Sequence, residues 1–336
     1  MSSLNRQFLL AQRPVGPASR ETFSYVETPT GEPGPGQVLV ENLYLSLDPA
    51  MRGWMNDARS YIAPVALGEV MRALGVGKVV ASQHPDFSVG DHVSGVVGVQ
   101  DYFLGEPRGF HKVDPNQAPL PLYLSALGMT GMTAYFALLD VGQPKAGETV
   151  VISGAAGAVG SVAGQIARIK GCRVVGIAGG RAKCDWVINE LGFDACIDYK
   201  AGSVKADLKE HCPKGVDIYF DNVGGDILDD VLARIGRGAR IIICGAISQY
   251  NNTTPVQGPK NYLSLLVNRA RMEGMVVFDY ADRFPVAVAE LAGYLKDGRM
   301  KSKEDVVQGL DTFPETLMKL FTGQNFGKLV LQVAQD

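Results

Sequence analysis

The chain has 336 residues, a length at which a single hydrophobic core stops growing and two domains become the natural expectation. Apolar residues make up 46% of it and charged residues 20%, as in ordinary globular proteins, which argues against a disordered or fibrous chain. The formal net charge of −3 supplies no broad positive field, so neither nucleic acid nor an anionic membrane is expected as a partner.

Residues 1–124 are rich in glycine and proline, and short β-type runs alternate there with turns. Val38–Val40 and Gly77–Ala81 are two such runs, and Pro33–Gly36 is one of the turn clusters that separate them. No long amphipathic helix is visible in this part of the sequence. The pattern predicts a compact, mostly-β domain.

From about residue 124 the pattern changes to alternating strands and helices. The strands are apolar runs of the kind that is buried on both faces of a parallel sheet. They cover residues 148–153, 173–178, 217–220 and 240–243, and helices are predicted over 125–139 and 161–170. This alternation predicts a doubly wound α/β domain over residues 125–299.

The end of the chain reads as a helix over 313–320 and a strand over 328–333. Too little sequence remains there for a third domain. We therefore expect residues 300–336 to return to the first domain, which would consist of residues 1–124 and 300–336.

The strongest local signal is a glycine-rich turn between a strand and a helix. The strand ends at Ser153, and Gly154-Ala-Ala-Gly157-Ala-Val-Gly160 follows. Glycines at such a turn let the backbone approach a pyrophosphate, which the helix N-terminus stabilises. The spacing departs from G-x-G-x-x-G, but the strand before and the helix after supply the right context. The predicted pyrophosphate-binding residues are Gly154, Ala156, Gly157, Ala158, Val159 and Gly160, with a glycine turn that holds no ligand as the alternative.

The end of the second strand decides which dinucleotide is expected. An NAD site would carry an acidic residue there to bind the ribose hydroxyls. The sequence instead reads Ala178-Gly-Gly180-Arg181-Ala-Lys183, with no carboxylate and two cations. This composition favours a 2′-phosphate, so NADPH is predicted with Gly180 and Lys183 among its contacts. Two solvated cations at a helix start are the alternative.

Neither the cysteines nor the histidines form a metal-ligand pattern. The five cysteines are odd in number and include no C-x-x-C pair, so reduced thiols are expected. They are Cys172, Cys184, Cys196, Cys212 and Cys244, and the four scattered histidines are His84, His92, His111 and His211. No apolar run reaches membrane-spanning length, and the first sixteen residues lack the apolar core of a signal peptide, so a cytoplasmic protein is expected.

Several motifs together resemble the medium-chain dehydrogenase/reductase superfamily. Within it, the chain is most similar to the zinc-free branch of prostaglandin reductases (leukotriene B4 12-hydroxydehydrogenases), plant alkenal double-bond reductases and bacterial NADPH-dependent curcumin reductases. The resemblance runs over nearly the whole chain and includes residues 47–52, 128–135, 155–160, 221–225, 244–248 and 325–328. It implies a GroES-like, mostly-β catalytic domain beside a Rossmann nucleotide-binding domain.

The resemblance also implies roles for single residues. Lys183 and Tyr199 would contact the region of the 2′-phosphate. Asn222 and Cys244 would lie beside the pyrophosphate or the nicotinamide ribose. The remaining cofactor-binding residues would be Asn325 near the diphosphate, Met129 and Thr133 near the nicotinamide, and Phe278. Ordinary turn and core roles are the alternatives for Asn222, Asn325 and Cys244. A homodimer formed by extending the sheet of the nucleotide domain is implied as well.

The chemistry expected of such a site is reduction of a conjugated carbon–carbon double bond. Zinc-dependent relatives polarise a carbonyl through a Cys/His pair and a Gly-His-Glu segment, and neither occurs in this sequence. Hydride addition to the β-carbon of an enone or enal places negative charge on the carbonyl oxygen as an enolate. A hydrogen-bond donor aimed at that oxygen is sufficient to stabilise it.

The candidate donors are the cofactor ribose hydroxyl and a tyrosine phenol, which with a pKa of about 10 stays protonated at neutral pH. Tyr250 follows a strand of the parallel sheet, where ligands bind. Tyr61 of the first domain and Tyr262 are further candidates, and any of the three could simply fill a wall or core. Arg52 could orient substrate or cofactor, or pair with an acid. Residues 249–262 read as a mobile loop that covers substrate.

Two other functions remain open. Zinc-free relatives also reduce quinones with the same cofactor, so an NADPH-dependent quinone reductase is one alternative. The other is a catalytically silent NADPH-binding protein that acts as a sensor, a lens-type structural protein or an RNA binder. The acidic composition weighs against its RNA-binding form.

Overall fold

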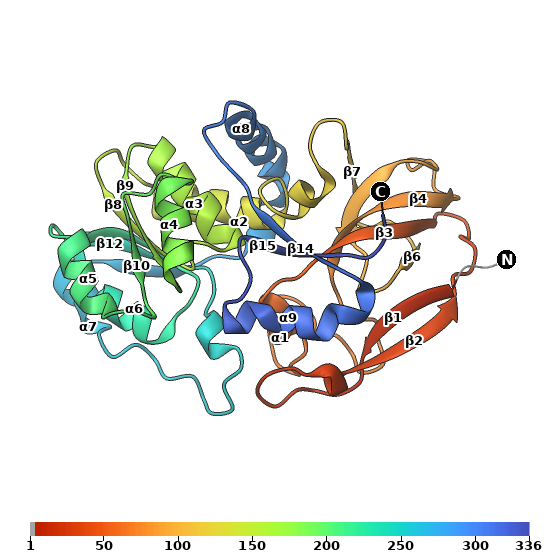
Figure 1. Cartoon of the computed structure of the whole chain (residues 1–336), viewed down its shortest axis with the longest axis horizontal. Helices are drawn as coiled ribbons and strands as arrows, with labels where there is room; N and C mark the ends of the chain where they lie inside the picture. Colours follow the sequence, from red (N-terminus) through yellow and green to blue (C-terminus); the bar gives the residue numbers. More distant parts are fainter. Residues whose placement is uncertain (1–3, 336) are drawn as a thin grey trace. The chain divides into compact units, whose positions relative to one another are not determined.

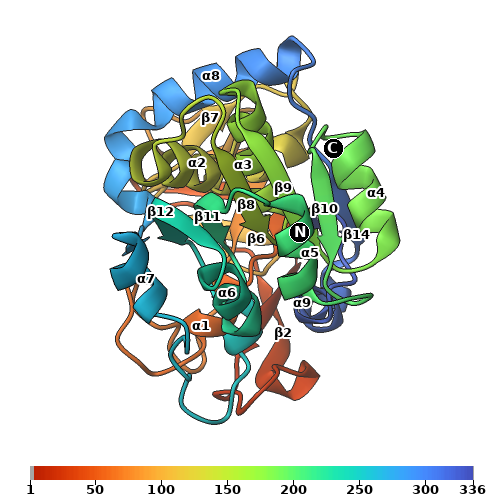
Figure 2. The same ribbon diagram turned by 90° about the vertical axis from the view of Figure 1, so that its left-hand side faces the viewer.

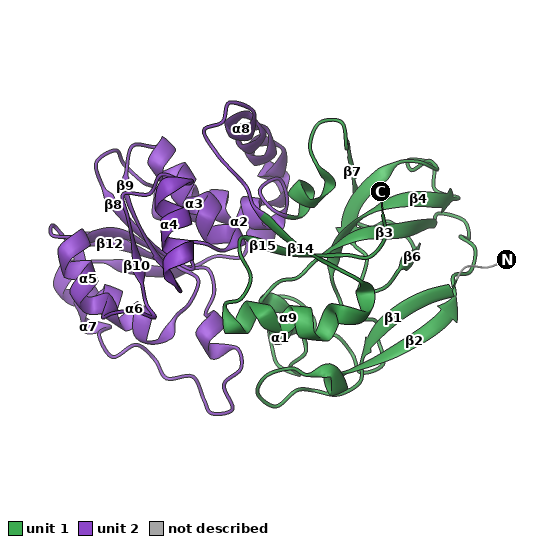
Figure 3. Ribbon diagram, in the orientation of Figure 1, with its two compact units in different colours: residues 1–124, 304–336 green, residues 125–303 purple. Residues whose placement is uncertain are grey.

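The computed structural model describes residues 4–335, and Figure 1 and Figure 2 show its elements from two sides. The chain divides into two compact units, which Figure 3 colours separately. Unit 1 comprises the chain up to residue 124 and from residue 304 onward, and unit 2 comprises residues 125–303.

The boundary between the units lies a few residues later than the sequence predicts. Residues 300–303 belong to unit 2, whereas the sequence places the boundary after residue 299. Met300 donates its N–H to the carbonyl of Tyr294, and Lys301 donates its N–H to Gln165 Oε1 over 2.7 Å. These bonds hold the segment against the helices of unit 2.

Unit 1 is built on a seven-stranded sheet and a separate hairpin. The sheet has the order β14-β15-β3-β4-β5-β7, and β6 also pairs with β3. Its strands are β3 (Val38–Ser46), β4 (Leu74–Ser82), β5 (His92–Val96), β6 (Tyr102–Gly105), β7 (His111–Val113), β14 (Glu304–Gln308) and β15 (Lys328–Gln332). The hairpin consists of β1 (Leu4–Leu10) and β2 (Phe23–Pro29). The last strand of the chain, β15, pairs antiparallel with β3.

One hydrophobic core cluster of unit 1 joins the hairpin to the C-terminal helix α9 (Phe313–Thr322). Phe8 of β1 and Phe23 of β2 both pack against Phe313, with the Phe23 and Phe313 ring centroids 4.9 Å apart. A proline in the first turn and a left-handed glycine after the last fix the ends of α9. The other short helices of unit 1 are α1 (Ala50–Trp54), η1 (Arg20–Thr22), η2 (Leu120–Leu124) and η6 (Leu310–Thr312).

Unit 2 is a doubly wound domain around a six-stranded sheet. All neighbouring strands run parallel in the order β10-β9-β8-β11-β12-β13. They are β8 (Thr149–Ser153), β9 (Arg173–Ala178), β10 (Ala195–Asp198), β11 (Val216–Asp221), β12 (Ile235–Ile243) and β13 (Arg271–Gly274). The sheet grows outward from β8 in both directions, so the carboxyl ends of β8 and β11 mark the point where the winding reverses.

Helices cover both faces of this sheet. Figure 2 shows α2 and α3 on one face and α5 and α6 on the other. The helices of unit 2 are α2 (Met129–Phe136), α3 (Ala158–Ile169), α4 (Arg181–Asn189), α5 (Val204–His211), α6 (Gly225–Leu232), α7 (Leu263–Asn268) and α8 (Phe284–Lys296), with shorter turns at η4 (Ile247–Gln249) and η5 (Val277–Arg283). The predicted α/β fold class, with a parallel nucleotide-binding sheet and a mostly-β part, is confirmed.

The first helix of unit 2 departs from the prediction of one helix over 125–139. Gly128 has an extended backbone, and α2 begins only at Met129. The preceding residues form a tight turn, in which the carbonyl of Ser125 accepts hydrogen bonds from Gly128, Gly131 and the hydroxyl of Thr130. At its other end the helix widens into a π-helical stretch, η3 (Ala137–Gly142).

Candidate cofactor-binding site

The glycine turn joins β8 to α3 at the reversal point of the sheet. Gly154 has a φ of +62°, and Gly157 precedes the first residue of α3, Ala158. A Cβ on residue 160 would lie 2.3 Å from the carbonyl oxygen of Gly154, so only glycine fits there. No side chain caps the N-terminus of α3, and its first turn carries no acidic residue. The backbone amides of this helix start therefore suit an anion.

A buried carboxylate, Asp221, organises the neighbouring strand end. Its Oδ1 accepts hydrogen bonds from the hydroxyls of Ser153 (3.1 Å) and Tyr219 (2.8 Å) and from the N–H groups of Val223 (3.0 Å) and Gly224 (2.9 Å). Asp221 is 1% exposed, and this burial raises the pKa of its carboxyl. The four donors bend the chain after β11 into a fixed turn.

The turn after β11 holds Asn222 against the end of β8. The Asn222 N–H donates to Ser153 Oγ over 3.0 Å, and its side-chain amide donates to the Ser153 carbonyl over 2.7 Å. A Cβ on residue 154 would lie 3.5 Å from the Cβ of Asn222, so the two residues are neighbours. Asn222 thus lies beside the glycine turn.

The end of β12 joins the same cluster. The carbonyl of Asp221 accepts hydrogen bonds from the N–H groups of Cys244 (2.9 Å) and Gly245 (3.1 Å). Burial raises the pKa of the Cys244 thiol to about 12, so it is protonated at neutral pH. The Tyr250 hydroxyl oxygen accepts a hydrogen bond from the N–H of Ala246 over 3.1 Å, which sets the ring at this strand end.

A second group of predicted residues meets at the ends of β9 and β10. Gly180 has a φ of +96° and donates its N–H to Asp198 over 2.7 Å. A Cβ on Gly179 would lie 2.7 Å from the Tyr199 hydroxyl, so glycine leaves room for that phenol. Lys183 lies in the first turn of α4, where its N–H donates to the Gly180 carbonyl. The structure thus brings Gly180, Lys183 and Tyr199 together.

Met129 and Thr133 lie one turn apart on α2. The Thr133 hydroxyl donates to the Met129 carbonyl over 2.8 Å. Both residues are half-buried, whereas most other residues of α2 are buried. They therefore share the face of the helix that stays partly open.

Glu290 anchors this helix in a way that the sequence did not reveal. Its carboxylate accepts hydrogen bonds from the hydroxyls of Tyr135 (2.5 Å) and Tyr294 and from Lys170 (3.2 Å). The three donors come from α2, α8 and the end of α3. This cluster fixes α2 against two neighbouring helices.

Two further candidates lie on other elements of unit 2. Tyr262 directly precedes α7 and is 58% exposed, and Phe278 lies in η5 and is 45% exposed. Residues 250–262 form neither helix nor strand. The end of that segment is attached to α6, because Asn261 donates to Asp229 through its N–H (3.0 Å) and its side chain (2.9 Å).

Three predicted residues belong to unit 1, and the first of them is Arg52. Arg52 is 3% exposed, and its guanidinium donates to the carbonyls of Gly16 and Pro14 and to Asn56 Oδ1. These bonds tie the N-terminal loop to α1. Among the described residues, Arg52 is thus bonded to two carbonyls and one side-chain amide rather than to an acid, and its role in orienting substrate or cofactor stays a prediction.

Tyr61 and Asn325 are the other two predicted site residues that belong to unit 1. Tyr61 is 56% exposed in the segment after α1. The Asn325 side chain donates to the Gly327 carbonyl over 3.1 Å and so stabilises the turn before β15.

Within residues 4–335, no three or more His, Cys, Asp or Glu side chains are grouped so that they could hold a metal ion. No helix in that range combines the length and apolar character needed to cross a membrane.

The strand order and the glycine turn at the first strand–helix junction make unit 2 a dinucleotide-binding domain. Comparison with protein-family models agrees with this class. Residues 6–113 match the model described as N-terminal domain of oxidoreductase, and residues 158–293 match the model described as zinc-binding dehydrogenase.

Known proteins resemble the chain over almost its full length. The NADPH-dependent curcumin reductase of Escherichia coli is 43% identical, over 99% of this chain and 98% of that protein. The 2-alkenal reductase (NADP(+)-dependent) of Nicotiana tabacum is 42% identical, over 90% and 89%. The crystal structure of CurA from Vibrio vulnificus in complex with NADPH matches with a TM-score of 0.94 and 43% identity, over 98% of this chain and 100% of that one. The chain therefore belongs to the medium-chain dehydrogenase/reductase family, in the group that contains these reductases.

Proposed function

We propose that this protein uses NADPH to reduce the α,β carbon–carbon double bond of small enones and enals. Two features of unit 2 carry the proposal. The start of α3 at the glycine turn has no side-chain cap, and the first turn of α4, after β9, carries Lys183 and no acidic residue. The relatives named curcumin reductase and 2-alkenal reductase support the substrate class.

The residues of unit 2 fit the parts of this cofactor. The pyrophosphate would bind at the start of α3, where a Cβ on Gly160 would collide with backbone. Lys183 and Tyr199 would hold the 2′-phosphate, and Asn222 and Cys244 the nicotinamide ribose. The nicotinamide would lie near Met129 and Thr133, with Phe278 as a further contact. From unit 1, Asn325 is proposed for the diphosphate. NADPH, when bound, supplies the hydride.

Tyr250 is our choice for the group that stabilises the enolate. Its ring is set at the carboxyl end of β12 by the bond from Ala246. A phenol O–H aimed at the carbonyl oxygen would stabilise the charge that develops there. Tyr61 of unit 1 is the alternative donor, and Tyr262 a further substrate contact. No step of this chemistry calls for a metal ion.

The function is tested by following NADPH absorbance with 2-alkenals, long-chain enones, curcumin and quinones, and NADP with simple alcohols. We expect the fastest turnover with an enone or enal, and no loss of rate after dialysis against a chelator. Faster turnover of quinones would favour a quinone reductase. Cofactor binding without any hydride loss would indicate a silent binding protein, and turnover of alcohols alone would contradict the proposal.

Two variants test the residues. Tyr250→Phe should lower kcat by about 100-fold with little change in KM, while Tyr61→Phe should not. The reverse result would move the role to Tyr61. Lys183→Glu should weaken NADPH binding far more than NADH binding, because only NADPH carries the 2′-phosphate. Equal weakening of both would remove Lys183 from that contact.

We also propose a cytoplasmic homodimer. β13 is the edge strand of the six-stranded sheet, and α7, which packs on the adjacent strand β12, has no buried residue. Leu263, Leu266 and Val267 of α7 are 56%, 76% and 65% exposed. A second copy could pair with β13 and cover these side chains. Light scattering should give twice the chain mass, and Leu266→Asp should lower it; a monomer at micromolar concentration would contradict the dimer.

A further inference from the structure

Two cysteines meet between α4 and β10, and the proposed reaction uses neither. Cys184 follows Lys183 in the first turn of α4 and is 6% exposed, and Cys196 is half-buried in β10. Both are free thiols, and each influences the pKa of the other, so the two side chains are neighbours. They are separated by eleven residues in the sequence, so the packing of α4 on β10 brings them together.

The side-chain directions around Gly176 support this contact independently. Gly176 of β9 is the register partner of Cys196. A Cβ on Gly176 would lie 3.1 Å from Val187 Cγ1 and 3.2 Å from Cys196 Sγ. Cys196 therefore points toward the face that α4 covers. Val187 and Cys184 are three residues apart, and they are the two buried residues of α4.

The two thiols differ in acidity in a way that suits stepwise oxidation. The neighbouring Cys196 lowers the pKa of the Cys184 thiol, while Cys184 and burial raise the pKa of Cys196. A cysteine whose pKa is lowered, next to a second cysteine, is the usual arrangement of a redox-sensitive pair. By contrast, burial raises the pKa of Cys172 and of Cys212 to about 11.

We propose that Cys184 and Cys196 form a reversible disulfide with a peroxide as oxidant, and that this disulfide weakens binding of NADPH. The second part rests on the proposed assignment of the 2′-phosphate to Lys183 and Tyr199. The Cys184 thiolate attacks one peroxide oxygen, and the O–O bond breaks to give a sulfenic acid and hydroxide. The Cys196 sulfur then attacks the sulfenic sulfur and releases water. Overall, two thiols and one hydrogen peroxide give one disulfide and two waters.

The disulfide would act on the cofactor through its position. An S–S bond is about 2.05 Å long, which is shorter than any non-bonded contact between two sulfur atoms. Forming the bond therefore draws the first turn of α4 toward β10. Lys183 precedes Cys184 on that turn. Asp198, two residues after Cys196, holds the N–H of Gly180. Both sides of the proposed 2′-phosphate site therefore shift when the bond forms.

The test uses the whole protein treated with hydrogen peroxide, with or without saturating NADPH. We expect the intact mass to fall by two hydrogens and two free thiols to be lost, and peptide mapping to join Cys184 to Cys196. Cys212→Ala, which removes another buried cysteine of unit 2, should behave like the parent. Cys184→Ala and Cys196→Ala should form no such bond. In a dithiothreitol redox buffer, saturating NADPH should shift the thiol–disulfide equilibrium toward the reduced pair, because coupling between two sites is reciprocal at equilibrium.

The consequence is measured by titrating oxidised and reduced protein with NADPH and NADH. The Kd for NADPH should rise about fivefold or more on oxidation and return with dithiothreitol, and the Kd for NADH should change less. Absence of the Cys184–Cys196 bond after peroxide treatment would overturn the proposal, as would a disulfide that leaves NADPH affinity unchanged. Reduced protein that binds no NADPH would contradict the proposed function instead, and the mass measurement would still report on the cysteine pair.

Discussion

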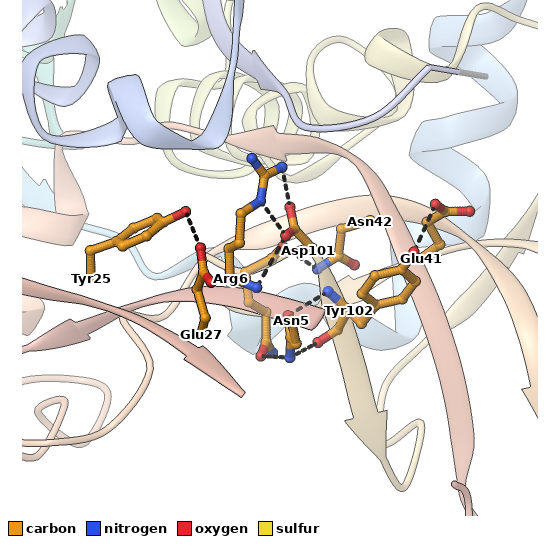
Figure 4. A network of polar contacts seen from close by, with 9 residues as sticks. Asn5, Arg6, Tyr25, Glu27, Glu41, Asn42, Asp101 and Tyr102 are labelled. Atoms are coloured by element: carbon orange, nitrogen blue, oxygen red, sulfur yellow. Dashed lines mark hydrogen bonds and ion pairs between the residues drawn. The ribbon is translucent and has the colours of Figure 1, made fainter. Parts of the chain in front are cut away.

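Each unit contains a polar network centred on an aspartate, and the two carboxylates are held by different kinds of hydrogen-bond donor. In unit 1, Arg6 grips Asp101 with two guanidinium nitrogens, at 2.6 and 3.0 Å, and with its backbone N–H at 3.1 Å (Figure 4). In unit 2, Asp221 is held by two hydroxyls and two backbone N–H groups. The first network is an ion pair between chain segments, whereas the second shapes one turn.

The surroundings explain this difference. The hairpin of β1 and β2 is a separate two-stranded sheet. Backbone hydrogen bonds, such as that from the Met71 N–H to the Phe8 carbonyl, join it to the rest of unit 1, and side chains add further links. Asn5 does so by donating to the Tyr102 carbonyl and accepting from the Tyr102 N–H, both over 2.9 Å, as Figure 4 shows. Asp221 instead lies where an anionic cofactor is proposed to bind. Hydroxyl and amide donors fix the turn there, so no lysine or arginine side chain has to pair with Asp221.

The largest difference between the networks should appear when each carboxylate is removed. Asp221→Ala leaves several buried donors without an acceptor, at about 1–3 kcal/mol each, so unit 2 should lose roughly 3 kcal/mol of unfolding free energy. NADPH affinity should fall as well, because Asn222 loses its fixed turn. Urea unfolding can be followed by fluorescence of Trp186 in α4, in a Trp54→Phe background that removes the one tryptophan of unit 1.

The control for this experiment is Asp221→Asn, which keeps one acceptor oxygen and should lose less stability than Asp221→Ala. If the two variants unfold alike, the four hydrogen bonds to Oδ1 are not what stabilises the turn.

The ion pair of unit 1 should contribute less. The Arg6 side chain is 41% exposed and Asp101 is 13% exposed, so solvent screens the interaction. A double-mutant cycle of Arg6→Met and Asp101→Asn should give a coupling of about 1 kcal/mol. Fluorescence of Trp54 in a Trp186→Phe background should report it, and NADPH affinity should not change.

A matched cycle on the exposed pair Arg108–Glu106, with side chains 87% and 54% exposed, should give a coupling near zero, about 0.3 kcal/mol or less. Equal couplings for the two pairs would mean that the bidentate geometry of Arg6 and Asp101 adds nothing to unit 1.

Much of unit 2 was predictable because its signals are local. Apolar runs specify buried parallel strands, and the glycines between Ser153 and Ala158 mark a turn that approaches an anion. The family predicted from the motifs is confirmed by the full-length relatives. The start of α3 at Ala158 rather than at Ser161 follows from the conformation of Gly157, which directly precedes the helix.

The side-chain contacts that sequence reasoning missed join distant segments of the chain. Arg52 bonds to Gly16 and Pro14, more than thirty residues away, and nothing near Arg52 signals this. The pairing of Cys184 with Cys196 requires α4 to lie on β10. Asp221 did leave a signal: an apolar strand that ends in Asp-Asn before two glycines is typical of a side chain that closes its own turn.

The smallest expected effect is on the pH dependence of the unfolding free energy. Burial raises the pKa of Asp221, so the folded protein binds this proton more tightly than the unfolded chain does. The resulting destabilisation is absent below the unfolded-state pKa and grows as the pH rises through the folded-state pKa. Asp91 of unit 1 is the opposite case, because the hydrogen bond from Lys112 lowers its pKa. Its stabilisation is present above the unfolded-state pKa and is lost as the pH falls through the folded-state pKa.

These opposite signs can be measured with Asp221→Asn and Asp91→Asn, each in the background that leaves one tryptophan in the same unit. Between neutral pH and the ordinary pKa of aspartate, acidification should make the parent more stable relative to Asp221→Asn. Over the range that extends below that pKa, acidification should make the parent less stable relative to Asp91→Asn. If the stability difference between parent and variant changed with pH in the same direction for both residues, the comparison would be contradicted. Asp221, held by hydroxyls and amides, would then titrate like Asp91, which is paired with a cation.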